Sequence, residues 1–287
     1  MLTGTGQDIR RKPEWLRKKA NPNDQSEMRR LLGDLRLNTV CQQALCPNIS
    51  DCFSCGQATF LILGKNCTRL CSFCNVEKTT PVPVDLGEPE RVAEAVSRLK
   101  LSHVVITSPT RDDLSDGGAG LYVATVAAVR RASPATRIEL LIPDFQGSVA
   151  GLASVVAVQP DIIGHNVETV PRLYGIRSGA DYLRSLGVLR MCAEMGPHIR
   201  TKSGIMLGLG ESENEVLMVF EALRGVDCAY LSIGQYLAPS RSHFPVQEFV
   251  LPEIFSSLRL QALEMGFSHV ESGPYVRSSY HAGTYLL

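Results

Sequence analysis

Short apolar runs alternate with amphipathic stretches from residue 58 onward. The runs that read as strands are 58–63, 103–107, 137–142, 161–166, 203–209 and 229–237. Apolar residues recur at helical spacing over 92–99 behind Pro89, and 216–223 repeats this pattern behind a capping box of Ser212 and Glu215. Apolar strands separated by helices predict a parallel sheet that is buried on both faces.

Six strand–helix units are too few for a complete eight-unit barrel, so we expect an α/β fold built as a partial (β/α)6 TIM-type barrel. A seventh apolar segment, 269–272, leads into the C-terminal tail. In such folds, ligands bind at the C-terminal ends of the strands. Side chains that follow the strands are therefore the candidates for chemistry.

The two ends of the chain lack this alternation. Residues 1–40 are polar and irregular except for a predicted helix over about 26–35, and residues 41–56 are rich in cysteine without a clear period. We therefore divide the chain into an N-terminal extension over 1–56, a barrel over 57–266, and a C-terminal segment over 267–287 that closes the barrel mouth.

Charge and hydropathy narrow the class of protein. The 287 residues carry 29 basic and 29 acidic side chains, and this balance argues against a nucleic-acid-binding protein. No run of about 18 apolar residues is present, so no transmembrane helix is expected. The first residues also lack the apolar core of a secretion signal. These observations predict a cytoplasmic protein that binds neither nucleic acid nor membrane.

Cysteine is the informative residue type. Seven of the nine cysteines lie between Cys41 and Cys74, whereas Cys192 and Cys228 stand in apolar surroundings and are expected to be buried. Crowded cysteines in a large chain without a secretion signal indicate metal binding rather than disulfides.

Cys67, Cys71 and Cys74 form a CxxxCxxC motif directly after the first predicted strand. Three thiolates on one short loop can bind three irons of a [4Fe–4S] cluster and leave the fourth iron open to a substrate. A zinc site is the alternative, but it would need a fourth Cys or His nearby and favours CxxC pairs. The spacing, with Phe73 before the last cysteine, resembles the signature of the radical S-adenosylmethionine superfamily.

Cys41, Cys46 and Cys52 form a second motif, CxxxxCxxxxxC, which by itself fits several metals. Together with the sequence around it and the tail RSSYHA at 277–282, it resembles the lipoyl synthase family. The resemblance runs from about residue 12 to residue 283, and it implies a second, auxiliary [4Fe–4S] cluster.

The resemblance also implies how that auxiliary cluster is completed. In the family, a serine of the tail is the fourth ligand, and we assign Ser279, with Ser278 as the alternative. Cys55 is a further thiol that the family pattern does not require. It is either a bystander in the loop or a spare ligand for the auxiliary cluster.

A binding site for S-adenosylmethionine at the strand ends is implied as well. Its candidates are Thr107 after the second strand, Asn166 and Glu168 after the fourth, and Arg177 and Lys202 for carboxylate contacts or substrate orientation. Structural alternatives exist, because Glu168 also suits a helix start and a lone Arg or Lys is commonly a solvated surface charge. Pro109 stands where the family usually has valine, so the loop there can differ in shape.

The resemblance implies a radical sulfurtransferase with no catalytic side chain beyond the cluster ligands. Two S-adenosylmethionine molecules would be cleaved at the first cluster. Two sulfur atoms from the auxiliary cluster would then be inserted into an octanoyl chain on a lipoyl carrier domain. The implied partners are octanoylated 2-oxoacid dehydrogenase acyltransferase subunits, the glycine cleavage carrier protein, and an electron donor such as ferredoxin or flavodoxin. We expect a monomer.

Two other interpretations remain open at the level of sequence. One is a different two-cluster radical enzyme, against which the RSSYxA tail and the spacing of Cys41, Cys46 and Cys52 argue. The other is a zinc-stabilised binding module without catalysis, which would contain zinc and no iron.

Overall fold

A curved sheet forms the centre of the molecule. The computed structural model describes residues 12–17, 26–280 and 282–286. Its eight strands follow one another in chain order across the sheet. They are β1 (Asn38–Thr39), β2 (Thr59–Leu61), β3 (His103–Thr107), β4 (Arg137–Leu141), β5 (Ile162–Gly164), β6 (Arg200–Leu207), β7 (Tyr230–Gln235) and β8 (His269–Gly273). Strands β2 to β8 are all parallel, and β1 pairs antiparallel with β2.

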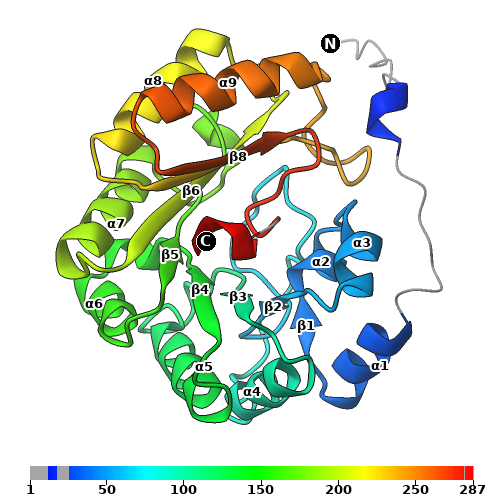
Figure 1. The fold of residues 1–287 in the computed structure, drawn as a ribbon, viewed down its shortest axis with the longest axis vertical. Coiled ribbons are helices and arrows are strands. Elements are labelled where there is room, and N and C mark those ends of the chain that lie inside the picture. The colour runs from blue at the N-terminus through cyan, green and yellow to red at the C-terminus, as the bar shows by residue number, and fades with distance from the viewer. Residues whose placement is uncertain (1–11, 18–25, 281, 287) are drawn as a thin grey trace.

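Helices cover the outer face of this sheet (Figure 1). The barrel helices are α4 (Glu88–Arg98), α5 (Ala119–Ala132), α6 (Val149–Ala157), α7 (Tyr182–Met195), α8 (Glu213–Arg224) and α9 (Pro252–Glu264). Before β2 lie η1 (Glu14–Leu16), α1 (Ser26–Asp34), α2 (Val40–Gln43) and α3 (Ile49–Ser54), and the other short helices are η3 (Phe145–Gly147), η4 (Pro171–Ile176) and η5 (Ala282–Leu286). Because β1 and β8 are the two edges of the sheet, the barrel is partial.

The six predicted strands are confirmed, and the seventh apolar segment joins them as the parallel strand β8. The predicted capping box at Ser212 and Glu215 starts α8 as expected. Strand β1 was not foreseen, because two residues are too few to show a period.

Apolar side chains between sheet and helices form two main clusters. One packs β2 to β5 against α4, α5 and α6, and includes Ile106 and Leu140. The other packs β6, β7 and β8 against α8 and α9, and includes Phe220 and Leu231. Full burial of one such side chain contributes about 1.5–3 kcal/mol, so these clusters hold the strand ends in a rigid frame.

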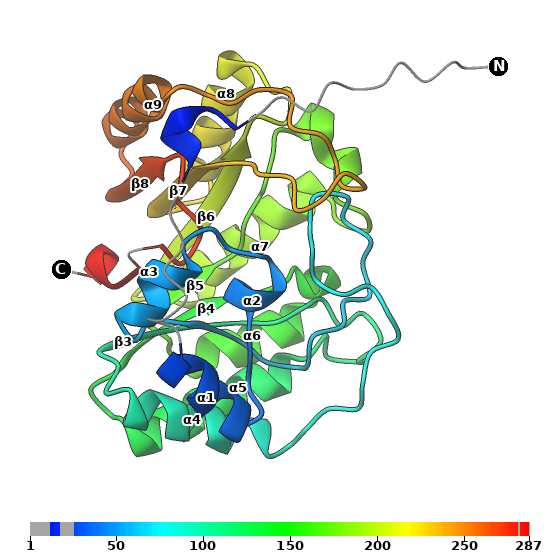
Figure 2. The ribbon, with the colours of Figure 1, turned by 90° about the vertical axis from the view of Figure 1, so that its right-hand side faces the viewer.

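The two ends of the barrel are built differently. The long loop after β2, which carries Cys67, Cys71 and Cys74, lies at the C-terminal ends of the strands, whereas η5 lies at the opposite end (Figure 2). We expected the C-terminal segment across the barrel mouth. In the structure its first part lines the interior, and its last turn packs near His103 at the start of β3.

No helix among the described residues is long and apolar enough to cross a membrane.

Candidate functional site

The loop after β2 gathers the first three thiols. The Cys67 N–H donates to Glu77 O at 2.7 Å, and the Arg69 N–H donates to Cys67 Sγ at 3.4 Å. A turn between Cys71 and Cys74 follows, with the Cys74 N–H 3.2 Å from Cys71 O. Burial is the main cause that raises the pKa of Cys74 to about 11, and the Cys71 and Cys67 thiols contribute a smaller part of this rise. The turn thus holds Cys71 and Cys74 on one short loop with Cys67.

Arg69, inside the CTRLC segment, anchors this loop. Its guanidinium donates to both carboxylate oxygens of Asp112 at 2.7 and 2.9 Å, and to both of Asp144 at 3.0 and 2.7 Å. Burial opposes ionisation of Asp144, but the hydrogen bonds from Arg69 outweigh it and lower the pKa of Asp144 to about 2. The clamp ties the cysteine loop to the loops that follow β3 and β4.

The second group of thiols comes from the segment before β2. Thr39 caps α2, which carries Cys41, and α3 carries Cys52. Burial raises the pKa of Cys41, and hydrogen bonds from Thr59 partly offset this rise. Cys41, Cys46 and Cys52 line one cavity of about 220 Å³, which we call the outer cavity.

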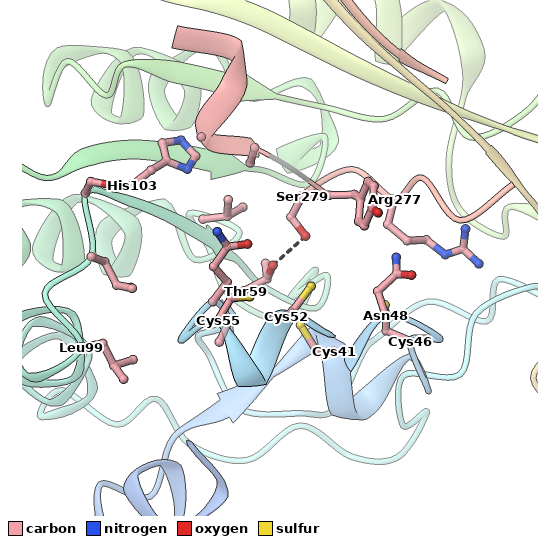
Figure 3. Close-up of a pocket in the computed structure, with 18 of the residues that line it drawn as sticks. Cys41, Cys46, Asn48, Cys52, Cys55, Thr59, Leu99, His103, Arg277 and Ser279 are labelled. Carbon is pink, nitrogen blue, oxygen red and sulfur yellow. Dashed lines mark hydrogen bonds between the residues drawn. The ribbon is translucent and has the colours of Figure 1, made fainter. Parts of the chain in front are cut away.

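The C-terminal tail meets this segment at two hydrogen bonds. Asn48 Nδ2 donates to Tyr275 O at 2.7 Å, and Thr59 Oγ1 donates to Ser279 Oγ at 2.7 Å. Ser279 lies across the outer cavity from the cysteines (Figure 3). Residues separated by 220 or more positions in the chain thus line one site.

A second cavity of about 230 Å³, which we call the inner cavity, faces the C-terminal ends of the strands. Leu141, Asn166, Met206 and Gly234 contribute to its wall from the ends of β4 to β7. It shares a wall with the outer cavity, made of Cys41, Cys46, Thr59, Arg277 and Ser279. The thiols Cys41 and Cys46 and the expected cofactor contacts Asn166 and Glu168 therefore line one cavity.

Asn166 and Glu168 stand together in the inner cavity. Asn166 Nδ2 donates to Glu168 Oε1 at 3.1 Å and to Ser278 Oγ at 2.6 Å. Glu168 adopts a φ of 67°, and its backbone bridges to β6 rather than starting a helix. Burial raises the pKa of Glu168, and the charge of Arg177 partly offsets the rise. Ser278 is thus engaged by Asn166, whereas Ser279 faces the cysteines.

Arg177 and Thr107 lie at this same end of the barrel. Arg177 Nη1 donates to the Tyr174 hydroxyl at 2.5 Å. Burial raises the pKa of Cys71, and the positive charge of Arg177 partly offsets this rise. The Ser72 N–H donates to Ile176 O at 2.9 Å, so the segment that carries Arg177 contacts the first thiol loop. Thr107 Oγ1 donates to Leu141 O at 2.8 Å, so its hydroxyl links two neighbouring strands.

Lys202 is the candidate that the structure does not bring to the others. It lies near the start of β6, is 1 % exposed, and donates to Glu139 Oε1 at 2.9 Å. Its Nζ stands 3.7 Å from the centre of the Tyr285 ring in η5. This position is at the opposite end of the strands from Asn166 and Glu168, so it lends no support to a cofactor contact.

Several residues of the site were missed at the level of sequence. Arg69 could not be recognised from the sequence, because no spacing pairs it with Asp112 and because Asp112 is equally suited to cap a helix. Thr59 belongs to a continuous apolar run and shows no polar signal until Ser279 lies beside it. Asp116, in contrast, does cap α5, since its carboxylate accepts from the N–H groups of Gly118 and Gly120.

The donor chemistry fits iron–sulfur clusters. Among the described residues, no three His, Cys, Asp or Glu side chains converge on a point where one metal ion could bind. A cubane cluster instead binds each thiolate through a different iron, so its ligands stand farther apart than those of a single ion. No carboxylate lines the described wall of the outer cavity, and this excludes the oxygen-rich set that Mg²⁺ or Ca²⁺ requires.

Comparisons with known proteins agree with this chemistry. Residues 61–223 match the family model of the radical SAM superfamily. The chain is 70 % identical to the lipoyl synthase of Geobacter metallireducens over 277 residues, which covers 96 % of this chain and 98 % of that protein. It is 69 % identical to the lipoyl synthase of Geobacter sulfurreducens, with 97 % and 92 % covered.

The fold has counterparts among solved structures. Streptococcus suis SuiB bound to S-adenosylmethionine superposes with a TM-score of 0.60 at 9 % identity, over 74 % of this chain and 48 % of that one. At this identity the likeness concerns the fold alone. The family model and the two relatives carry the assignment, and on that basis the chain belongs to the lipoyl synthase family of the radical SAM superfamily.

Proposed function

We propose that this enzyme inserts two sulfur atoms into the octanoyl chain of an octanoyl-lysyl carrier domain, with two S-adenosylmethionine molecules and with an auxiliary [4Fe–4S] cluster as sulfur donor. One observation carries the proposal. Cys41, Cys46, Cys52 and Ser279 line one cavity, and this cavity shares a wall with the inner cavity at the strand ends. A sulfur source would thereby border directly on the space for the substrate.

Cys67, Cys71 and Cys74 would hold the first cluster, and Asn166, Glu168, Arg177 and Thr107 are our candidates for cofactor contacts. When bound, the clusters and S-adenosylmethionine supply radical chemistry, which the reaction needs because no side-chain acid or base removes hydrogen from an unactivated carbon. The residues of this chain position the reactants. Arg69 supports this role, since its clamp fixes the loop that carries the first three thiols.

The wall of the inner cavity suits an aliphatic chain. Leu141, Ile205, Met206 and Val276 contribute apolar surface, and Glu168 and Asn166 contribute the polar groups. An apolar, enclosed space excludes water and other hydrogen donors from the reacting carbon. The octanoyl chain would lie here, between the first thiol loop and the shared wall.

Ser279 is our proposed fourth ligand of the auxiliary cluster. Ser279 lines both cavities and its hydroxyl accepts from Thr59, whereas the hydroxyl of Ser278 accepts from Asn166. A serine oxygen is a harder and poorer ligand for iron than a thiolate. This property supports a site from which one iron must be released when sulfur is withdrawn.

The remaining assignments are proposals of the same kind. We propose that the substrates are carried by 2-oxoacid dehydrogenase acyltransferase subunits and the glycine cleavage carrier protein, and that ferredoxin or flavodoxin supplies electrons. We also propose that the protein is a cytoplasmic monomer, with an N-terminal extension that ends at residue 56 and a barrel that ends at residue 266.

The first test is iron and sulfide content after anaerobic purification. We expect about eight irons in the unmodified protein. About four should remain in Cys41→Ala/Cys46→Ala/Cys52→Ala and about four in Cys67→Ala/Cys71→Ala/Cys74→Ala. Bound zinc, or four irons that vanish in both variants, would refute the two-cluster site.

A second test separates the two serines. We expect Ser279→Ala to lose sulfur insertion into an octanoylated carrier domain, which mass spectrometry of the carrier measures. The same variant should change the spectrum of the auxiliary iron. Ser278→Ala is the matched control, and its iron spectrum should stay unchanged. The opposite pattern would assign the ligand to Ser278.

A further inference from the structure

The auxiliary thiols separate two cavities that face opposite ends of the barrel. The inner cavity lies at the C-terminal ends of β4 to β7. The outer cavity is lined instead by 99–103, the segment that leads into β3, and by Gly283 of η5. Both of these elements lie at the N-terminal ends of the strands. The site therefore has a second approach that does not pass through the space for the substrate.

The rim of the outer cavity is exposed and polar. Gln57, Lys100, Ser102 and Gly283 on its lining are all exposed. The cations Lys100 and Arg277 lie on the wall, and none of the described lining residues is a carboxylate. A wall with thiols and without carboxylates favours iron over a hard cation such as Mg²⁺.

Cys55 stands at this rim as a fourth thiol. All nine cysteines are among the described residues, and Cys55 alone of them is exposed. It caps the C-terminus of α3, and its N–H donates to Cys52 O at 3.2 Å. Residues three apart on a helix lie on one face, so Cys55 and Cys52 are neighbours on the same wall (Figure 3). Neither of them lines the inner cavity.

We propose that Cys55 is an exchangeable iron ligand, which binds iron entering through the outer cavity and delivers it to Cys41, Cys46 and Cys52. The inference rests on the proposed function, because an enzyme that consumes its auxiliary cluster must rebuild it between turnovers. A soft thiol at the entrance captures ferrous iron better than the hydroxyl of Ser279 does. Cys55 then yields its place as Ser279 completes the ligand set.

The step is a ligand exchange without electron transfer. The Cys55 Sγ–Fe bond forms as a water molecule leaves the ferrous ion, and the thiol proton passes to solvent. On delivery, the Cys55 Sγ–Fe bond breaks, a bond to the next thiolate forms, and Cys55 takes up a proton again.

The test uses the full chain with Cys67→Ala/Cys71→Ala/Cys74→Ala, which confines iron to the auxiliary site. The iron-free protein is titrated anaerobically with ferrous iron alone and then supplied with sulfide and a mild oxidant, because the oxidised cubane contains ferric as well as ferrous iron. Cys55→Ser in this background should weaken binding of the first ferrous ion by about tenfold, the scale at which supporting groups affect metal affinity. It should also slow the rise of iron–sulfide absorption and still reach about four irons. Gln57→Ala is the matched control, since it changes another exposed side chain on the rim of the outer cavity and keeps every thiol.

Alkylation gives an independent measurement. With one ferrous ion per chain, Cys55 should resist iodoacetamide, and in the fully loaded protein it should react. Equal iron affinity and equal assembly rate in Cys55→Ser and Gln57→Ala would overturn the inference and leave the proposed function intact. A lower final iron content in Cys55→Ser would also overturn it, because Cys55 would then be a permanent ligand. Absence of iron from the background protein itself would refute the proposed function together with the inference.

Discussion

Tyr285 holds the end of the C-terminal tail against the bottom of the barrel. Its ring is 3 % exposed and lies 4.4 Å from the ring centre of His269 and 5.3 Å from that of Tyr230. Lys202 Nζ stands 3.7 Å from the ring centre. Ser279 precedes Tyr285 by six residues, so this contact fixes one end of the short segment that presents Ser279 to the cysteines.

Two substitutions at Tyr285 separate the role of its ring from that of its hydroxyl. Tyr285→Ala removes a buried aromatic ring, which costs about 3–5 kcal/mol, and part of this loss is the cation over the ring. Because η5 is the last element, the loss should fall on docking of the tail rather than on the whole barrel. Tyr285→Phe removes a buried hydroxyl that has no hydrogen-bond partner in the described structure, so stability should be unchanged or about 1 kcal/mol higher.

Amide hydrogen exchange over 276–280 measures this docking directly. Since each 1.4 kcal/mol is a factor of ten, we expect exchange in Tyr285→Ala to be about 100-fold faster or more. The same variant should lose iron from the auxiliary site to a chelator more quickly, while iron held by the first thiol loop is retained. Slow exchange in Tyr285→Ala, or fast exchange in Tyr285→Phe, would refute the anchoring role.

Three further predictions concern buried ionisable groups. Glu139→Gln leaves the Lys202 ammonium buried without its carboxylate, which should cost about 3–5 kcal/mol in urea unfolding, and adding Lys202→Met should restore most of it; no recovery would contradict the pairing. Burial lowers the pKa of His165 to about 4, so as the pH falls below 6.5 this histidine is protonated in the unfolded chain before it is protonated in the folded one. The free energy of unfolding therefore decreases from pH 6.5 downward, by about 1.4 kcal/mol at pH 5.5. His165→Gln should lack this part of the pH dependence. Burial raises the pKa of Asp144, but the hydrogen bonds from Arg69 outweigh this effect and leave the pKa at about 2. The ionised carboxylate therefore contributes about 2 kcal/mol to the free energy of unfolding above pH 3.8, and this contribution is lost as the pH falls toward 2. Asp144→Asn should remove the contribution at pH 7, and equal unfolding midpoints at pH 7 would refute the clamp.

The strands of the barrel could be predicted because burial on both faces demands continuous apolar runs. The runs at 103–107 and 137–142 became β3 and β4 nearly residue for residue. Strand β1 and helix α2 could not be predicted, because two and four residues are too short to show a period. Helix α3 has six residues and lies in the cysteine-rich segment, which has no clear apolar period.

Local spacing along the chain determines which thiols can share a loop, and this much was readable from Cys67, Cys71 and Cys74. The sequence by itself also determined the parallel α/β architecture, through its alternation of apolar strands and amphipathic helices. Contacts between distant residues depend on register and on where the tail runs, which no local pattern records. Only the tertiary structure brought Ser279 to Thr59 and showed that Cys41 and Cys46 line the same cavity as Asn166 and Glu168.

Lys202 illustrates the physical reason. Its motif placed it on a strand of the barrel, but a residue at the start of a strand and one just past its end face opposite ends of the sheet, since each residue advances about 3.3 Å. Its pairing with Glu139 on β4 and its cover by Tyr285 follow from the curvature of the sheet and from the packing of η5 against the barrel. The sequence determined the chemistry of each side chain, and folding decided which chemistries meet.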